Sequence, residues 1–264
     1  MEIEDEGLKE VKIGSIIRPK EITQVKKPVS QIKKSRKECL EELNTIIEES
    51  KVILFVLDAR VPSECRSSYF ESKCSSQNKG LIFVLNKADL VPKEVLKKWK
   101  KELNKDHPTV TFSSIESNYE DVVKKIEEIK KGTKVGIIGY PNMGKKTLLE
   151  RLNKSSIENL QLPKKVGTIL SKQEPTSLIV KTVEDINDVG DPYVLVHALL
   201  KKIPKEKVLL KYEIPDYKTT QEFLEHTSRS KRLILKGGLT DYDKTAREVL
   251  ADWIFGRIPF YQDC

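Results

Sequence analysis

Residues 134–147 read Lys-Val-Gly-Ile-Ile-Gly-Tyr-Pro-Asn-Met-Gly-Lys-Lys-Thr, and this stretch decides the fold of the chain. A short apolar run enters a glycine turn, and the spacing of the leucines that follow predicts a helix. Strand, glycine loop and helix in this order are typical of a loop that cradles phosphate groups. Gly139 and Gly144 let backbone N–H groups face a phosphate, in front of a helix N-terminus. Lys145 adds a positive charge within reach of the outer phosphates.

The loop departs from the usual pattern Gly-x-x-x-x-Gly-Lys-Ser/Thr at one position. The hydroxyl that holds magnesium should follow the lysine directly, but Lys146 stands there and Thr147 comes one residue later. Each helical residue turns the chain by about 100°, so Thr147 does not simply replace the missing hydroxyl, and magnesium is doubtful. The loop alone also fits an ordinary strand, turn and helix. The nucleotide contacts expected from it are Asn142, Met143, Gly144, Lys145, Lys146 and Thr147.

A second motif lies upstream, where the apolar strand at residues 81–85 ends in Asn-Lys-Ala-Asp-Leu. Asn-Lys-x-Asp is the element with which GTPases recognise guanine. The carboxylate of Asp89 can accept hydrogen bonds from both guanine N–H donors, whereas adenine would leave it unpaired. By itself the motif could be a turn at a strand end, but together with the phosphate loop it favours guanine-nucleotide binding. The contacts expected from it are Asn86, Lys87, Asp89 and Leu90.

The two motifs come in inverted order, because Asn86 precedes Gly139. In this order the chain resembles the circularly permuted GTPases, and it is most similar to the nucleostemin-like nucleolar GTPases. The resemblance covers residues 35–264. Besides the two loops it rests on residues 49–60 with Asp58-Ala59-Arg60, residues 87–92, residues 209–215 and Lys236-Gly237-Gly238.

This resemblance implies GTP or GDP as the ligand. It also implies a nuclear and nucleolar factor for biogenesis of the large (60S) ribosomal subunit, with the pre-60S particle, ribosomal RNA and assembly proteins as partners. Ser113 and Ser114 loosely match a turn whose backbone contacts the guanine oxygen. Thr168 resembles the threonine of switch one, but the Asp-x-x-Gly that should follow is missing, so residues 158–180 resemble a shortened switch region.

Two functions remain open at this point. The first is a guanine-nucleotide-binding assembly factor with weak hydrolysis. The second is a nucleotide-independent structural placeholder, a pseudo-GTPase on pre-ribosomal particles. Lys146 and the missing Asp-x-x-Gly are the evidence for the second, because phosphoryl transfer relies on magnesium and oriented water. The favoured interpretation is retained guanine-nucleotide binding with poor hydrolysis. A generic metabolic P-loop enzyme has little support, since no substrate-binding constellation follows the loop.

Composition limits the possible partners. The 264 residues are 38% hydrophobic and 33% charged, which is typical of a soluble globular chain. No apolar run approaches the roughly 20 residues of a membrane span, so no membrane contact is expected. The four cysteines and three histidines show no metal-ligand spacing. They predict a reducing intracellular compartment and no structural zinc.

The net charge of +8 is unevenly spread. Residues 11–37 contain nine Lys and Arg against one Glu, whereas residues 1–10 are acidic. Such a basic arm suits RNA phosphates and makes binding salt-dependent. A solvated tail and a nuclear address are the alternatives. We expect an extended N-terminal arm over residues 1–35.

Four apolar strands alternate with helices, which predicts an α/β fold with a doubly wound, mostly parallel sheet. The phosphate and guanine loops then both lie at the carboxyl ends of strands, where such sheets bind ligands. The expected domains are a permuted GTP-binding domain at 36–182 and a mainly helical domain at 183–264. Helices are expected at 36–49 and after the signals at Pro92, Asp191, Thr219 and Thr240.

Three side-chain roles follow from local pattern. Trp99 is expected in the core rather than as a base-stacking platform. Asp58 is expected to cap its turn and to pair with Arg60, although the chemical role of this triplet does not follow from the sequence. The cations around the Lys-Gly-Gly segment either grip RNA phosphate or lie solvated; they are Lys231, Arg232 and Lys236.

Overall fold

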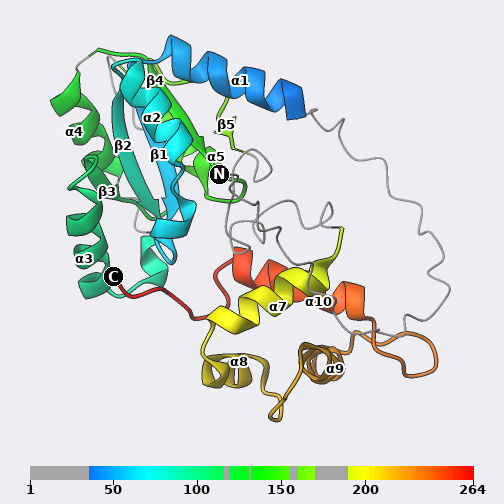
Figure 1. Cartoon of the computed structure of the whole chain (residues 1–264). Coiled ribbons are helices and arrows are strands. Elements are labelled where there is room, and N and C mark those ends of the chain that lie inside the picture. The colour runs from blue at the N-terminus through cyan, green and yellow to red at the C-terminus, as the bar shows by residue number, and fades with distance from the viewer. Residues whose placement is uncertain (1–35, 116–118, 131, 155–159, 170–189) are drawn as a thin grey trace, which may run out of the picture. The chain divides into compact units, whose positions relative to one another are not determined.

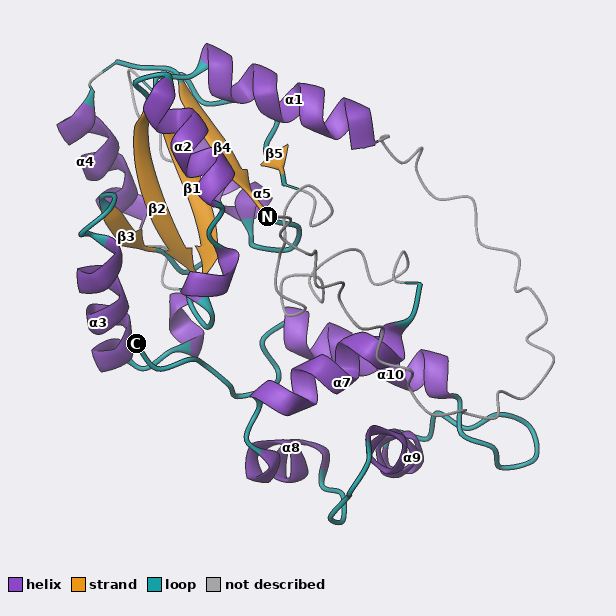
Figure 2. Cartoon of the chain, viewed as in Figure 1, coloured by secondary structure: helices purple, strands orange, loops and turns teal. Residues whose placement is uncertain are grey.

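The computed structural model describes residues 36–115, 119–130, 132–154, 160–169 and 190–264. These residues belong to one compact unit, which contains a sheet with its covering helices and a group of C-terminal helices (Figures 1 and 2). The expected basic arm over residues 1–35 lies outside the described residues, and so does most of the expected switch region, including residues 170–180.

The sheet has five strands and every neighbouring pair is parallel. The strands are β1 (Val52–Asp58), β2 (Gly80–Asn86), β3 (Thr109–Thr111), β4 (Val135–Gly139) and β5 (Gly167–Thr168). Their order in the sheet is β3-β2-β1-β4-β5. The chain therefore builds outward from β1 in one direction and continues from β4 in the other, which places the topological switch point between β1 and β4.

Burial explains why the central strand has no alternation of apolar and polar residues. All seven residues of β1 are buried, and successive side chains point to opposite faces, so both faces are covered. The covering helices are α1 (Arg36–Glu49), α2 (Ser68–Ser76), α3 (Lys93–Leu103), α4 (Tyr119–Ile129) and α5 (Lys145–Lys154). The predicted parallel sheet and the helix at 36–49 are confirmed, and Trp99 is buried in the core as expected.

The C-terminal helices are α7 (Pro192–Lys202), α8 (Lys205–Tyr212), α9 (Thr220–Ser230) and α10 (Tyr242–Ile254). In Figure 2, α7 and α10 cross beside one another, and they pack together with α9. The expected cap at Asp191 is confirmed, because its carboxylate accepts a hydrogen bond from the N–H of Tyr193 at 3.1 Å. In the part of the chain that the structure describes, no helix is long and apolar enough to cross a membrane.

Two predicted helix starts need correction. Pro92 is not the first residue of α3 but precedes it as the N-cap, with an extended ψ of 140°. Thr240 does not cap α10. Asp241 does, because its carboxylate accepts from the N–H of Lys244 at 3.1 Å while Thr240 bridges Ile234 in an antiparallel pair. In both places the pattern located the helix but misplaced its boundary by one residue.

A buried ion cluster joins the end of β1 to the last turn of α10. The side chains of Asp58 and Arg60 are 1% and 0% exposed. The Nε and Nη2 atoms of Arg60 donate to the two carboxylate oxygens of Asp58 at 2.9 and 2.8 Å. The Arg60 backbone N–H also donates to Asp58 at 3.0 Å, so the predicted turn cap and ion pair are both confirmed. Lys87 donates to Asp58 at 2.9 Å as a second cation.

The cluster controls the charge of Asp58. Burial by itself would raise the pKa of this carboxyl, but the positive charges of Arg60 and Lys87 outweigh burial and hold the pKa well below its usual range. The carboxylate therefore stays ionised throughout the neutral range. Its contribution to stability is present above the pKa of an unfolded Asp and is lost only as the pH falls through the depressed folded pKa.

We expect Asp58→Asn to lower the free energy of unfolding by about 3–5 kcal/mol at pH 7, because it leaves buried cations without a counter-charge. Urea denaturation measures this loss. The matched control is Asp243→Asn, which breaks an ion pair whose carboxylate is 56% exposed and should cost less than about 1 kcal/mol. Equal losses in the two variants would contradict the role given to the cluster.

Candidate nucleotide-binding site

The guanine motif and the phosphate loop meet in space although 57 residues separate the contacting pair. The side-chain amide of Asn86, at the end of β2, donates from Nδ2 to the carbonyl oxygen of Met143 at 2.7 Å. Asn86 is buried at this contact. The strands that carry the two loops lie on either side of β1. The two motifs therefore form one site at the switch point of the sheet.

Close packing around the phosphate loop explains both of its glycines. Gly144 has φ +84°, and a Cβ at this position would lie 1.9 Å from the Nδ2 atom of Asn86. Gly139 has φ +151°, and a Cβ there would lie 2.6 Å from the carbonyl oxygen of Val56. A side chain at Gly144 would press on Asn86 of the guanine motif, and one at Gly139 would press on the backbone of β1. The backbone bend that was inferred from the sequence is therefore built into the packing of this loop against β1 and the guanine motif.

Lys145 is a buried cation at the start of α5. Its ammonium group donates to the carbonyl oxygen of Tyr140 at 2.5 Å, and no carboxylate among the described residues forms an ion pair with it. Burial, together with the nearby charge of Lys146, lowers the pKa of Lys145 to about 7. A dianionic phosphate would supply the missing counter-charge. This loop therefore fits an anion.

The side-chain hydroxyl of Ser113 positions Asp89 of the guanine motif. Ser113 Oγ donates to a carboxylate oxygen of Asp89 at 2.6 Å and accepts from the N–H of Ile115 at 3.1 Å. Asp89 is itself exposed. Ser113 was expected to act through its backbone; the structure adds a side-chain role, because it fixes the orientation of Asp89.

Ser114 lies in the same turn and links it to α5, the helix that follows the phosphate loop. Its carbonyl oxygen accepts a hydrogen bond from the Nη2 atom of Arg151 at 3.0 Å, and Arg151 lies on α5. The sequence did not single out Arg151, because a lone arginine in an amphipathic helix carries no motif. Asn142 and Met143 sit in the phosphate loop itself, and Asn142 has a left-handed φ of +54°.

Two residues of the guanine motif contact a different element. The Lys87 ammonium donates to Asp58 and also to the carbonyl oxygen of Ile254 at 3.1 Å. Leu90 packs against Gly256, where a Cβ would lie 2.4 Å from the Leu90 Cδ1 atom. The motif is therefore divided: Asn86 and Asp89 form contacts on the nucleotide side, whereas Lys87 and Leu90 contact the end of α10.

The metal side of the site does not fit magnesium at the usual position. Lys146 stands where the hydroxyl ligand belongs and its side chain is exposed, while Thr147 is half-buried one residue further into α5. Thr168 does lie next to the loop, since it pairs with Gly139 across β4 and β5. Among the described residues no group of three His, Cys, Asp or Glu could hold a metal ion.

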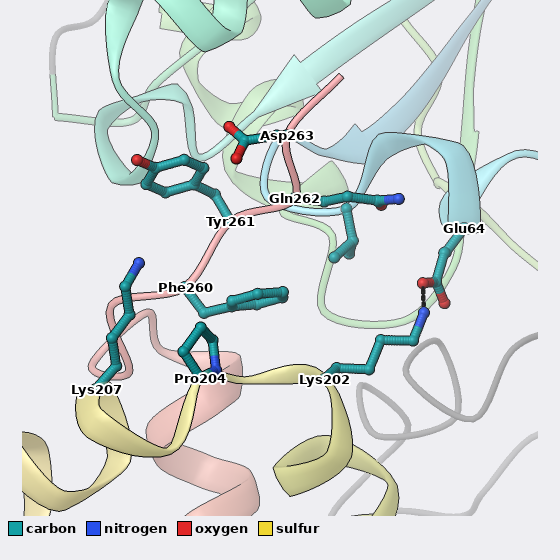
Figure 3. Close-up of a pocket in the computed structure, with 9 residues that line it drawn as sticks. Glu64, Lys202, Pro204, Lys207, Phe260, Tyr261, Gln262 and Asp263 are labelled. Carbon is teal, nitrogen blue, oxygen red and sulfur yellow. Dashed lines mark hydrogen bonds and ion pairs between the residues drawn. The ribbon is translucent and has the colours of Figure 1, made fainter.

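A separate hollow of about 390 Å³ lies beside the loop that follows Arg60 (Figure 3). The C-terminal tail and the junction of α7 with α8 form its other walls. Lys202 pairs with Glu64 across one end, and Lys207 lies 4.9 Å from the ring centroid of Tyr261. It contains none of the predicted nucleotide contacts, so it is not the nucleotide site.

Curated proteins of one kind are similar to the chain over most of its length. Nuclear/nucleolar GTPase 2 of Oryza sativa is 31% identical over 251 residues, which cover 83% of this chain and 47% of that protein. Guanine nucleotide-binding protein-like NSN1 of Arabidopsis thaliana is 32% identical over 275 residues, with 83% and 47% covered. The chain is a relative of the nucleolar GTPases. It spans about half the length of these curated relatives, and no family model matches it.

Solved structures agree on the fold of this nucleolar GTPase relative. The GNP-bound crystal structure of YlqF from T. maritima superposes with a TM-score of 0.66 at 19% identity, covering 85% of this chain and 99% of that one. The GDP-bound structure of the same protein gives a TM-score of 0.63 at 20% identity, with 82% and 95% covered. The predicted circularly permuted GTPase fold is confirmed.

We expect Lys145→Met to change how stability depends on pH. The unfolded lysine titrates near 10.4 and the folded one near 7, so charge burial destabilises the native protein most below pH 7. That penalty declines as the pH rises from 7 toward 10. The free energy of unfolding of the variant minus that of the parent should therefore fall by at least about 1 kcal/mol between pH 6 and pH 9.

Urea denaturation without nucleotide at several pH values measures this difference. The slope with pH is decisive, because the lost hydrogen bond to Tyr140 shifts all values alike. Lys146→Met, on an exposed neighbour whose charge is the smaller cause of the shift, should give a much shallower slope. A flat line for Lys145→Met would show that its ammonium is not buried as a charge.

Proposed function

We propose that the chain binds GTP or GDP between the phosphate loop and the guanine loop. One observation carries this proposal: the hydrogen bond from Asn86 to Met143, which joins two motifs that the sequence keeps far apart. The buried Lys145 would neutralise phosphate, and Asp89, oriented by Ser113, would accept the two guanine N–H donors. The bound nucleotide of the YlqF structures supports the same choice of ligand.

We further propose a nucleolar role in biogenesis of the large (60S) ribosomal subunit, with ribosomal RNA and assembly proteins of the pre-60S particle as partners. The names of the relatives, which include "nuclear" and "nucleolar", support this location. The basic segment 11–37 would contact RNA phosphates. In this proposal residues 36–182 bind the nucleotide, and the helices of residues 183–264 respond to its binding.

Hydrolysis in this proposal is weak. Lys146 cannot coordinate magnesium, and at about 4 Å it would repel the ion by a few kcal/mol in a medium of intermediate dielectric. The sequence also lacks Asp-x-x-Gly after Thr168. Each 1.36 kcal/mol of lost transition-state stabilisation slows the reaction tenfold. Losing both the magnesium ligand and Asp-x-x-Gly should therefore slow hydrolysis while nucleotide can still bind.

A second candidate is the nucleotide-independent placeholder. The hydrogen bond from Lys145 to Tyr140 favours it, because the ammonium group then binds a backbone carbonyl of its own loop in place of a phosphate. The two functions differ in one measurable respect, namely whether guanine nucleotide binds at all.

We expect GDP to bind at least ten times more tightly than ADP, because adenine leaves Asp89 without its two donors. Isothermal titration calorimetry measures both affinities. Asp89→Ala should abolish the preference by weakening GDP alone, whereas Asp243→Ala, on the exposed face of α10, should leave it unchanged. Equal GDP and ADP affinity in the parent chain would contradict guanine recognition, and no binding of either would favour the placeholder.

We expect GTP affinity to change less than about threefold when EDTA removes magnesium, because Lys146 supplies part of the charge that the ion usually supplies. Turnover should stay at or below about 10⁻⁴ per second, as in an unassisted GTPase. Lys146→Ser should make binding depend on magnesium and restore hydrolysis only partly. Strong magnesium dependence in the parent chain, or brisk hydrolysis that Lys146→Ser leaves unchanged, would refute this role of Lys146.

A further inference from the structure

The side chains that cap the last turn of α10 come from the residues that follow β1 and β2. A helix leaves its final carbonyl oxygens without backbone partners, and nearby cations are favourable there. The Nη1 atom of Arg60 donates to the carbonyl oxygen of Trp253 at 2.7 Å. The ammonium of Lys87 donates to that of Ile254 at 3.1 Å. Two consecutive carbonyls at the end of α10 are thus held by side chains from the Asp-Ala-Arg triplet and the guanine motif.

A cation–π contact and an apolar contact strengthen the same junction. The guanidinium carbon of Arg60 lies 3.7 Å from the centroid of the Trp253 ring, and Trp253 is fully buried. Such a desolvated cation–π contact is worth more than an exposed one. Gly256, with φ +72°, presses its backbone against Leu90 so closely that no side chain fits between them. The end of α10 therefore contacts the guanine loop through both polar and apolar groups.

This junction fixes the residues that would read the base. Lys87 adopts a left-handed conformation with φ +61°, which non-glycine residues rarely populate. Its hydrogen bonds to Asp58 and Ile254 hold it there. Asn86 directly precedes Lys87, and Asp89 lies between Lys87 and Leu90 in the chain, so the junction restrains Asp89 on both sides and Asn86 on one.

We propose that Asp58 and Arg60 are positioning residues for the guanine site, and that they couple guanine-nucleotide binding to the order of the last turn of α10. The proposal rests on the proposed function, since it gives the guanine loop a nucleotide to bind. The coupling is positive and reciprocal: a nucleotide that restrains residues 86–90 restrains residues 253–256, and a change at the end of α10 alters nucleotide affinity equally. A ligand or protein that displaces α10 would thereby release nucleotide.

The test uses hydrogen–deuterium exchange of the full chain, with and without saturating GDP, read at the amides of residues 253–256. None of these residues is among the predicted nucleotide contacts. In the parent chain GDP should slow their exchange at least threefold. In Arg60→Lys, a cation remains beside Asp58 but cannot bind both carboxylate oxygens and the Trp253 carbonyl together. This variant should lose GDP affinity at least fivefold, and saturating GDP should no longer protect residues 253–256.

Two further variants separate positioning from general destabilisation. Arg257→Lys alters a hydrogen bond to Asp252 at the same end of α10 without touching the guanine loop, and it should behave like the parent chain. Gly256→Ala changes a residue just beyond the C-cap of α10 and should press on Leu90, so it should weaken GDP at least threefold even if Arg60→Lys fails to fold. Weakening of GDP by Gly256→Ala, with Arg257→Lys unaffected, supports coupling.

The unfavourable outcomes are distinct. If the parent chain binds GDP but exchange at residues 253–256 does not change, the coupling is wrong and the proposed function stands. The same conclusion follows if Arg60→Lys and Gly256→Ala both bind GDP as tightly as Arg257→Lys. If the parent chain binds no GDP, the proposed function falls and the coupling falls with it.

Discussion

One buried carboxylate organises the centre of this molecule. Asp58 ends the central strand of the sheet, and it is ionised because Arg60 and Lys87 surround it. A charge in such a place is tolerable only when its partners are aligned with it. Arg60 and Lys87 meet that requirement and use their remaining donors on the carbonyls of α10. The arrangement of β1, the guanine loop and the last helix therefore depends on a single ion cluster.

The order of the strands explains how the two permuted motifs come together beside this cluster. Because β1 lies between β2 and β4, its end adjoins the guanine loop, and the loops after β2 and β4 meet at Asn86 and Met143. The guanine loop is thus held between two contacts. Asn86 ties it to the phosphate loop, and Lys87 and Leu90 tie it to α10. The proposed base recognition and the packing against α10 therefore both fall within residues 86–90.

Much of this arrangement could be predicted from local pattern. The continuous apolar run of β1 indicated a parallel strand, and glycine spacing located the phosphate loop, since both signals depend on neighbouring residues. Helix starts at Pro92 and Thr240 were misplaced by one residue. The fixed φ of proline suits both the N-cap and the first helical position, and at the start of α10 Asp241 caps the helix in place of Thr240. The roles of Arg151 and of the second half of the guanine motif could not be predicted. They depend on contacts with α5 and α10, which no spacing in the sequence encodes.

The central claim is that the two loops form one guanine site, and the backbone amide signals of the labelled chain in a two-dimensional ¹H–¹⁵N spectrum test it most directly. Adding GDP should shift the amides of residues 139–147 and of residues 86–90 together, with a single apparent affinity, whereas the amides around Gly237 and Gly238 should stay in place. Shifts confined to residues 139–147, or different affinities for the two stretches, would contradict the account.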